Sequence, residues 1–506
     1  MTVGKLSKLI IIFTGICSLH YACKDDDVAD ITPDEKDFID PGDTVTQTAW
    51  NYDTPFPFDQ TSKEELRAMP KKVFAHYFTQ FPISIDNREP GSDYYTTGYL
   101  SPGGENNKHI EYGGYLRVRP IPRSPRQESN WMEKDMEEEI RRAVALGLDG
   151  FTCDLLSPQG YHYDRVVMLL EAAERIDPGF KIVLMPDMEA FKNQTEKIAG
   201  VVKALGSYSS AYRLDDGRLV VSPYNAQVKD AVWWKGWLDQ MKVAGVDIAF
   251  VPLFQAWKNY ASSFAPISYG MSDWGWRSVN AQNAWVNTAQ EAHGYGPIWM
   301  MSVSPQDMRP REQRVWEAGN SEEYRVMWMN AINGGSDWVQ LVTWNDYGEH
   351  TIVAPSTGTQ YSFYDLSAYY TSWFKTGTAP AITRDVLYYF YREHKTSLRA
   401  KKQTKPFWFD TGSDSPSDQV ELVAFLTAPG KLEIEIKGEK QQKDGVAGIN
   451  VFKVPVKPGR PVFRLIRNGE AIINLPGAFK IKTEIGYQNL MYYGGSSSRL
   501  PVITEK

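Results

Sequence analysis

The segment Trp338-Val339-Gln340-Leu341-Val342-Thr343-Trp344-Asn345-Asp346-Tyr347-Gly348-Glu349 joins a short apolar run to an acidic and aromatic loop. Its first five residues have the length and composition of one buried strand of a parallel sheet. The loop places Asp346 and Glu349 three residues apart, beside Trp344 and Tyr347. Two neighbouring carboxyl groups can act as an acid and a base in one reaction. The segment predicts a strand that ends in a catalytic loop, unless the acids merely form an acidic turn.

Seven more apolar runs of similar length precede this one, and helical patterns separate most of them. They lie at 73–78, 151–155, 182–185, 219–221, 248–253, 267–271 and 298–303. Eight alternating units of strand and helix predict an α/β fold, the (β/α)8 TIM-type barrel. A doubly wound open sheet is the alternative, because a pattern alone does not show closure. No glycine-rich phosphate-binding loop supports that alternative.

Helical patterns are clearest at 131–146, 163–175 and 228–243. In the first of these, apolar residues recur every four positions, which places them on one face of a helix. Asn130 precedes the pattern as its expected N-cap. Gly147 follows it, and helices often end at such a residue.

The chain changes character after about residue 400, where runs rich in β-forming residues replace the strand-and-helix rhythm. These runs lie at 419–426, 431–436, 450–456, 462–467 and 470–475. Pro-Gly and Asn-Gly pairs between several of them mark turns. We expect a C-terminal antiparallel β-sandwich over 396–506, after a catalytic barrel over 61–395. The sandwich could bind carbohydrate, but packing against the barrel is the simpler role.

Residues 1–22 have the features of an export signal. Lys5 and Lys8 precede the apolar run 9–13, and Ala22-Cys23 with the acidic residues after it resembles the cleavage site of a Bacteroidetes-type surface lipoprotein. We expect lipidation at Cys23 and a place at the cell surface or outer membrane. An ordinary secretory peptide is the alternative. Residues 23–60 are acidic and poor in large apolar side chains, which predicts a flexible tether.

Composition and charge limit the partners that the chain can bind. Of its 506 residues, 42% are hydrophobic and 23% charged, as in a soluble globular protein. The net charge of −7 argues against nucleic acid, which needs a basic surface. No apolar run after the export signal is long enough to span a bilayer, so we expect membrane contact only through the lipid on Cys23. We expect a monomer that binds a polysaccharide or oligosaccharide.

The sequence predicts no cofactor and no metal ion. None of the histidines has His-x-x-x-His spacing. Once Cys23 carries a lipid, Cys153 has no second cysteine for a zinc site or a disulfide. No Gly-x-Ser-x-Gly segment predicts a serine nucleophile.

Polar and aromatic residues gather at the predicted strand ends, where TIM-type barrels carry their chemistry. We expect the polar ones to hydrogen-bond a substrate and the aromatic ones to stack on it, although packing or helix capping would explain each one alone. The candidates are His76, Tyr77, Asp154, Asp187, Tyr224, Trp257, Trp274, Trp299, Trp344 and Tyr347. With Asp346 and Glu349 as the catalytic pair, this set fits hydrolysis of a glycosidic bond, which two carboxyl groups carry out together.

Four segments carry a resemblance to a known family. They are Lys72-Val73-Phe74-Ala75-His76-Tyr77-Phe78, Leu148-Asp149-Gly150-Phe151, Trp344-Asn345-Asp346-Tyr347-Gly348-Glu349 and Val451-Phe452-Lys453-Val454-Pro455. They resemble glycoside hydrolase family 71, the α-1,3-glucanases or mutanases. The resemblance implies a (β/α)8 barrel with an appended β-domain that cleaves α-linked glucan, above all α-1,3-glucan. It also implies inversion, with Glu349 as general acid and Asp346 as general base, in the order seen in the related family 99 endo-α-mannosidases.

Two features depart from that family's pattern. His350-Thr351-Ile352 follows the acid motif where fungal members have Ser and His, and the insertion at 80–131 has no obvious counterpart. Both would lie near the substrate, so they leave the choice of polysaccharide open. Two alternatives therefore stand beside α-glucan hydrolysis. One is hydrolysis of another α-glycan such as α-mannan, and the other is glycan binding by a surface lipoprotein without catalysis.

Overall fold

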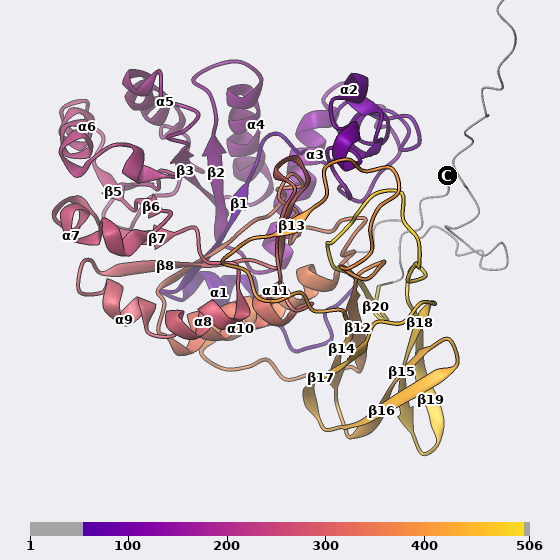
Figure 1. Cartoon of the computed structure of the whole chain (residues 1–506). Coiled ribbons are helices and arrows are strands. Elements are labelled where there is room, and N and C mark those ends of the chain that lie inside the picture. The colour runs from indigo at the N-terminus through magenta and orange to yellow at the C-terminus, as the bar shows by residue number, and fades with distance from the viewer. Residues whose placement is uncertain (1–53, 500–506) are drawn as a thin grey trace, which may run out of the picture. The chain divides into compact units, whose positions relative to one another are not determined.

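The computed structural model describes residues 54–499. The predicted export signal, the lipidation at Cys23 and the tether up to residue 53 lie outside these residues. Figure 1 shows a barrel of strands with helices around its outside, followed along the chain by two antiparallel sheets. The predicted fold class, a (β/α)8 TIM-type barrel followed by an antiparallel β-sandwich, is confirmed.

The parallel sheet closes on itself through β11 and through the interrupted strand β5–β6. β11 pairs with both β1 and β8. β5 pairs with β4, and β6 pairs with β7. Pro252 separates β5 from β6, because it has no backbone N–H to donate to the ladder. The strands are β1 (Lys72–Tyr77), β2 (Gly150–Leu155), β3 (Lys181–Pro186), β4 (Leu219–Val221), β5 (Ile248–Phe250), β6 (Leu253–Phe254), β7 (Gly270–Asp273), β8 (Ile298–Val303) and β11 (Trp338–Leu341).

Apolar side chains fill the barrel below the level at which its strands end. Phe74, Val183, Val220, Met300 and Trp338 belong to one buried cluster of this interior. Successive side chains of a strand point to opposite faces, so every second residue points inward. The inward positions turn polar two to four residues further along several strands, and the candidate site begins there.

The three helices predicted from periodicity are present as α3 (Trp131–Ala145), α4 (Tyr161–Ile176) and α6 (Ala231–Val243). Asn130 occupies the N-cap position of α3 as predicted, but its side chain makes no capping hydrogen bond. Gly147 adopts a φ of +82°, which turns the chain out of α3 toward β2. No helix within residues 54–499 is both long and apolar enough to cross a membrane. The other helices of the barrel are α5 (Ile198–Leu205), α7 (Ala261–Phe264), α8 (Val279–Gln282), α9 (Thr288–Ala292), α10 (Glu322–Asn333) and α11 (Ser362–Thr376).

The chain makes a long excursion between β1 and α3. It contains a π-helix (Tyr95–Leu100), α2 (Gly104–Asn107) and a 3-10 turn (Ile110–Tyr112). The buried ion pair of Arg119 with Asp93 (Nη1–Oδ1, 2.8 Å) fixes two parts of the excursion to each other. The insertion therefore has internal polar contacts of its own.

Two four-stranded antiparallel sheets form the sandwich, in the orders β17-β14-β12-β20 and β16-β15-β18-β19. Leu422, Ile434 and Phe463 belong to the core between them. β16 escaped prediction because six of its seven residues are exposed and it carries no alternation. The strands are β12 (Val386–Tyr391), β14 (Gln419–Leu426), β15 (Gly430–Ile436), β16 (Glu439–Gly445), β17 (Gly448–Pro455), β18 (Pro461–Arg467), β19 (Glu470–Pro476) and β20 (Tyr493–Ser496).

Strand β12 moves the boundary between barrel and sandwich. It lies inside the range 61–395 predicted for the barrel, yet it pairs with β14 and β20. Phe390 on β12 packs against Phe363 of α11, with ring centroids 5.0 Å apart. Nδ2 of Asn320 donates to the carbonyls of Phe390 and Gln419 (2.9 Å each). The predicted boundary is wrong by about one strand, because β12 is buried on both faces and reads as a barrel strand.

The first described residues already pack against α11 of the barrel, although the sequence analysis assigned them to the tether. Phe58 is 4% exposed, and its ring lies 5.2 Å from that of Tyr369. Helix α1 (Lys63–Ala68) then begins at a capping box, in which Ser62 and Glu65 exchange hydrogen bonds. The packed chain therefore begins before residue 61.

Candidate active site

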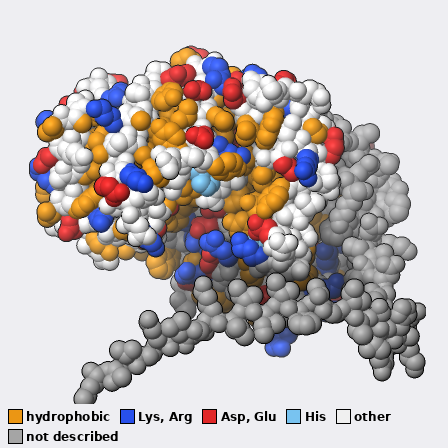
Figure 2. All heavy atoms as spheres, turned by 90° about the horizontal axis from the view of Figure 1, so that it is seen from above, with side chains coloured by type: hydrophobic (Ala, Val, Ile, Leu, Met, Phe, Trp, Pro, Cys, Tyr) orange, Lys and Arg blue, Asp and Glu red, His pale blue; other side chains and the backbone are white. Residues whose placement is uncertain are grey.

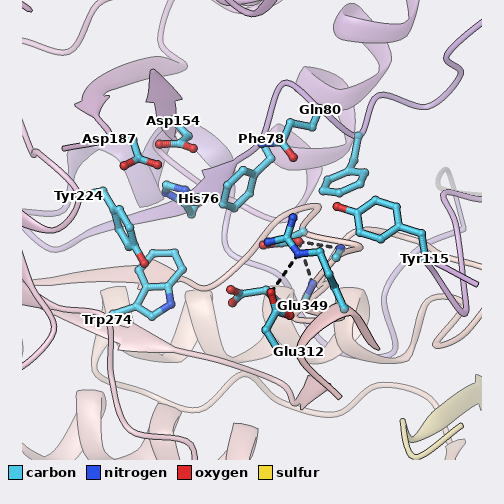
Figure 3. A pocket seen from close by; sticks show the side chains of 14 residues that line it. His76, Phe78, Gln80, Tyr115, Asp154, Asp187, Tyr224, Trp274, Glu312 and Glu349 are labelled. Atoms are coloured by element: carbon cyan, nitrogen blue, oxygen red, sulfur yellow. Dashed lines mark hydrogen bonds and ion pairs between the residues drawn. The ribbon is translucent and has the colours of Figure 1, made fainter. Parts of the chain in front are cut away.

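A cavity of about 220 Å³ opens where the barrel strands end. Figure 2 shows this face of the molecule, where basic and acidic side chains gather in a hollow bordered by hydrophobic ones. Figure 3 shows the side chains that converge on the cavity from several strands and loops. The predicted site residues that line it are His76, Asp154, Asp187, Tyr224, Trp274, Asp346 and Glu349.

Asn345 fixes the loop that carries the two acids. Its Oδ1 accepts the N–H of Phe78 (2.8 Å), and its Nδ2 donates to the carbonyls of Phe78 and Phe81 (2.9 Å each). Asn345 is 1% exposed, so these bonds replace water that it cannot reach. The end of β1 and the loop after β11 are thereby locked together on one side of the cavity.

Asp346 is held by its own loop. Its Oδ1 accepts the backbone N–H groups of Gly348 (2.8 Å) and Glu349 (3.0 Å), and its own N–H donates to Oγ1 of Thr343 (2.7 Å). The side chain is nearly buried, at 6% exposure. These contacts set the direction of the carboxylate before any substrate arrives.

Glu349 contacts a cation that the strand-end prediction did not include. Its Oε1 lies 2.8 Å from Nη1 of Arg309. Arg309, at the end of β9 (Asp307–Arg309), also binds Asp307 through Nε (2.8 Å) and Nη2 (2.7 Å). The second oxygen of Glu349, Oε2, is buried and has no hydrogen-bond partner among the described residues. The hydrogen-bonding capacity of that oxygen is therefore unused within the described residues.

Burial raises the pKa values of both acids, but to different degrees. It raises the pKa of Glu349 to about 8, with Arg309 opposing the rise and Asp307 and Asp346 adding to it. It raises the pKa of Asp346 to about 6, with the hydrogen bond from the Glu349 N–H and the charge of Arg309 opposing the rise. The two groups influence each other and titrate as a pair. Near neutral pH the pair favours a proton on Glu349 and a negative charge on Asp346.

His76, Asp154 and Asp187 form the opposite wall, as Figure 3 shows. Burial and the neighbouring carboxylates Asp187 and Asp346 raise the pKa of Asp154 well above its usual range. Neither oxygen of Asp154, nor Nε2 of His76, has a hydrogen-bond partner among the described residues. Burial lowers the pKa of His76 to about 3, so its ring is neutral. This wall presents polar groups whose hydrogen bonds a ligand would complete.

An aromatic corner closes the cavity at its side. The rings of Tyr224 and Trp274 lie 4.9 Å apart, edge to face, and Trp274 also contacts the ring of His76 at 5.1 Å. Nε2 of Gln255 donates to the Tyr224 hydroxyl (3.0 Å). The corner places apolar ring surface next to the polar wall, a combination that suits a sugar.

A sequence model of glycosyl hydrolase family 71 matches residues 126–502, which is more than half of the chain. The chain belongs to glycosyl hydrolase family 71. It is 23% identical over 393 residues to a protein of Schizosaccharomyces pombe named glucan endo-1,3-alpha-glucosidase, with 72% of this chain and 90% of that protein covered. It is also 23% identical to a Penicillium rubens mutanase, with 72% of this chain and 85% of that protein covered. A solved endo-alpha-mannosidase of Bacteroides thetaiotaomicron superposes with a TM-score of 0.48 at 14% identity, covering 61% of this chain and 98% of that one. Family membership confirms that the protein is a glycoside hydrolase.

Two predicted binding residues of this family 71 site face the wrong way. Tyr77 follows the inward His76 directly and so points outward, where its hydroxyl meets Sδ of Met136 on α3 (3.2 Å). Trp299 precedes the inward Met300 and is likewise buried outside the barrel. Both predictions are wrong, because neighbouring residues of a strand cannot share a face.

Two more aromatic predictions, Trp344 and Tyr347, are wrong for reasons of packing, and a third residue, Trp257, lies outside the acid cavity. Trp344 is fully buried, and its Nε1 donates to Glu139 on α3 (2.7 Å). Tyr347 is 1% exposed and packs against Phe81. Trp257 packs on Trp299 and lines a neighbouring cavity instead of the one that holds the acids.

His350, the point of departure from the family pattern, lies away from the substrate cavity. It is fully buried, with Nδ1 donating to the Met308 carbonyl (2.8 Å) and Nε2 accepting the N–H of Arg117 (3.0 Å). His350 therefore joins the insertion to the loop after β8. The expectation that it would lie near the substrate is wrong.

Several lining residues were missed because they lie in loops. The insertion supplies Gln80, Phe81 and Tyr115, and Phe78 directly follows β1. These residues precede residue 126, where the family match begins. The loop after β8 adds Arg311 and Glu312. The run Arg309-Pro310-Arg311-Glu312 was the one available signal, since charges so dense after a strand are unusual.

Among residues 54–499, no group of three or more His, Cys, Asp or Glu side chains could hold a metal ion.

Proposed function

We propose that this chain hydrolyses α-1,3-linked glucan with inversion at the anomeric carbon. The observation that supports this most is the pair of Glu349 and Asp346, which share one cavity but bind protons with unequal strength. Carboxyl groups with separated pKa values serve as acid and base in glycoside hydrolysis. The substrate follows from relatives named as a 1,3-alpha-glucosidase and a mutanase.

In this mechanism Glu349 is the general acid and Asp346 the general base. Oε2 of Glu349 carries the proton and gives it to the departing glycosidic oxygen as the bond to the anomeric carbon breaks. Asp346 takes a proton from a water molecule, whose oxygen attacks the same carbon from the other side. Arg309 stabilises the carboxylate that forms on Glu349 when its proton has left.

The opposite wall holds the sugar in this proposal. Asp154 and the Nε2 atom of His76 complete their hydrogen bonds on sugar hydroxyl groups. Trp274 and Tyr224 contact the apolar face of a ring. The binding thereby aligns the anomeric carbon with the two acids.

The deciding experiment offers the protein α-1,3-glucan, α-1,4-glucan and α-mannan and measures new reducing ends. We expect cleavage of α-1,3-glucan, with products that carry the inverted β-anomer when first released, as seen by NMR. Preferred cleavage of α-mannan would replace the proposed substrate. Binding of glucan without any cleavage would establish the alternative of a glycan-binding protein.

We also propose that the enzyme is exported and held at the outer membrane by a lipid on Cys23, and that it acts as a monomer. The support is the charged and apolar pattern of residues 1–22 and the acidic run after Cys23. A relative named for the ascus wall is compatible with export. Fractionation of cells with the Cys23→Ser variant tests this, because the variant should leave the membrane fraction. A variant that stays in the membrane would contradict the lipid anchor.

A further inference from the structure

A second cavity adjoins the acid pocket and shares a wall with it. It measures about 190 Å³ and is lined by Trp274, Trp276, Arg309 and Trp316, among others. Trp274 lines both cavities. Arg309 faces the second cavity and contacts Glu349 in the first with the same guanidinium group. A ligand that fills the acid pocket can therefore continue into the second cavity without leaving contact with the site.

The second cavity has unusually exposed aromatic walls. Trp276 is 46% exposed. Trp316 is half-buried, and the guanidinium groups of Arg314 and Arg309 lie 4.4 Å and 4.9 Å from its ring centroid. Trp408, on β13 (Trp408–Phe409), does not line the cavity, but it is 47% exposed and lies 5.7 Å from the lining residue Arg314. Tryptophan left open beside a cavity marks a binding surface, because soluble proteins otherwise bury such area.

Carboxylates offset part of the positive charge of the arginines that line this cavity. Nε of Arg314 binds Asp410 (2.6 Å). Arg309 binds both Asp307 and Glu349. Arg277, the third arginine of the lining, lies 3.5 Å from the same Asp307. Asp307 and Asp410 therefore offset only part of the positive charge of the three arginines, whose N–H groups and flat faces offer hydrogen bonds and stacking to a hydroxyl-rich molecule.

The row continues into a third cavity of about 240 Å³, which shares Gln255 and Trp276 with the second. Trp257 and Trp285 line its far part. Each cavity alone is smaller than the roughly 300–1,000 Å³ of a pocket for one drug-sized ligand, but together they reach that range. Trp276 stands between the second and third cavities and borders both.

We infer that the three cavities form one row of sugar-binding positions, in which Trp276 and Trp316 hold the glucan units that extend from the bond being cut. This inference rests on the proposed function and deepens it, since it assigns a substrate of several linked neutral sugars. Affinity should then grow with the number of sugar units until the row is filled.

Gly412 offers a way to disturb this row without removing an aromatic ring. Trp276 donates from Nε1 to the Gly412 carbonyl (3.2 Å). A β-carbon on Gly412 would lie 2.6 Å from Cζ2 of Trp276, so the indole would have to move. Gly412→Ala should therefore displace the ring, whereas Trp276→Ala removes it.

The experiment measures binding of neutral α-1,3-linked glucose oligomers of two, four and six units to the full chain carrying Glu349→Gln, so that nothing is cleaved. We expect affinity to rise with length. Trp276→Ala or Gly412→Ala added to this background should lower affinity for the six-unit oligomer about ten-fold, with less than a two-fold change for the two-unit oligomer. Trp233→Ala is the matched control. Trp233 lies on α6, outside the row, and is a half-buried tryptophan with Lys229 over its ring.

Affinity that is independent of length, or an unchanged length dependence in both variants, would overturn the inference. Tighter binding of a sulfated or uronic oligomer of equal length would overturn the assignment of a neutral ligand. In either case the wild-type chain would still cleave α-1,3-glucan, so the proposed function would stand. A chain that neither binds nor cleaves any of these glucans would overturn both.

Discussion

Nη1 of Arg309 lies 2.8 Å from Oε1 of Glu349, at the junction of two cavities. The positive charge lowers the pKa of Glu349 and that of Asp346. Arg309→Gln should therefore raise both pKa values and move both limbs of the pH–activity profile to higher pH by about one unit. Glucan hydrolysis measured across the pH range checks this. Arg213→Gln, outside the cavity, is the control, and an unmoved alkaline limb would show that Arg309 does not act on Glu349.

The wild-type enzyme should show a bell-shaped pH profile. Asp346 must be ionised to act as base, so activity falls as the pH drops below its pKa of about 6. Glu349 must be protonated to act as acid, so activity falls as the pH rises above its pKa of about 8. The profile of kcat/KM, from initial rates at glucan concentrations well below KM, reports these pKa values of the unliganded enzyme. A rate that keeps rising above pH 9 would contradict the role of Glu349.

The roles of the two acids can be separated by the leaving group. Glu349→Gln should lower hydrolysis of glucan about 1,000-fold, but should act almost normally on an α-glucosyl fluoride, whose fluoride leaves without a proton. Asp346→Asn should lose activity on both substrates, because both need an activated water.

The converse pattern, with fluoride hydrolysis kept by Asp346→Asn and lost by Glu349→Gln, would exchange the assignments. Asp239→Asn and Glu439→Gln are matched controls, since both carboxylates are exposed and lie outside the cavity.

His76 and Tyr77 should behave oppositely although they are neighbours. His76→Ala removes a cavity-facing group and should lower kcat/KM about ten-fold. Tyr77→Phe removes only the hydroxyl contact to Met136 and should leave kcat/KM unchanged. Steady-state kinetics on glucan give the answer. A large loss in Tyr77→Phe with intact folding would show that Tyr77 touches the substrate after all.

Asn345 should matter for stability as much as for activity. Asn345→Ala leaves the backbone N–H of Phe78 and two carbonyls without partners in a buried place. We expect the free energy of unfolding to fall by about 3 kcal/mol. Asn280 is exposed, and its side chain donates to the half-buried Asp414 (2.7 Å), so Asn280→Ala should change this free energy by less than about 1 kcal/mol. Denaturant unfolding of both variants tests the difference, and equal losses would contradict the clamp.

Much of the barrel and part of the site could be predicted from local patterns. Strand runs such as 298–303 coincide with the observed strand β8, because short buried runs are set by composition. Strand parity would have improved the site prediction. Once Phe74 is placed inside, His76 must point inward and Tyr77 outward, and the same rule separates Met300 from Trp299.

The rest depends on contacts between segments far apart in the chain. Arg309 meets Glu349, and Tyr115 reaches the cavity, only through the folding of loops that carry no periodic signal. The sequence places Trp344 in the wall of the site, but its indole N–H donates to Glu139 of α3, which holds the ring outside the cavity. β16 shows the same limit in the sandwich, because its polar residues pair through the backbone alone.

Strand β13 connects the barrel structurally to the C-terminal part of the chain. It lies between β12 and β14 in the sequence, yet it pairs with β10 (Arg314–Trp316) of the loop after β8 and places Asp410 on Arg314. The sandwich is therefore not a detachable module. A barrel truncated before β13 would lose Asp410, which lines the second cavity. A sandwich exchanged from a distant relative would replace β13 with a different segment. Substitutions in β13, which lies between two sandwich strands in the sequence, can therefore change the length of glucan that the barrel binds.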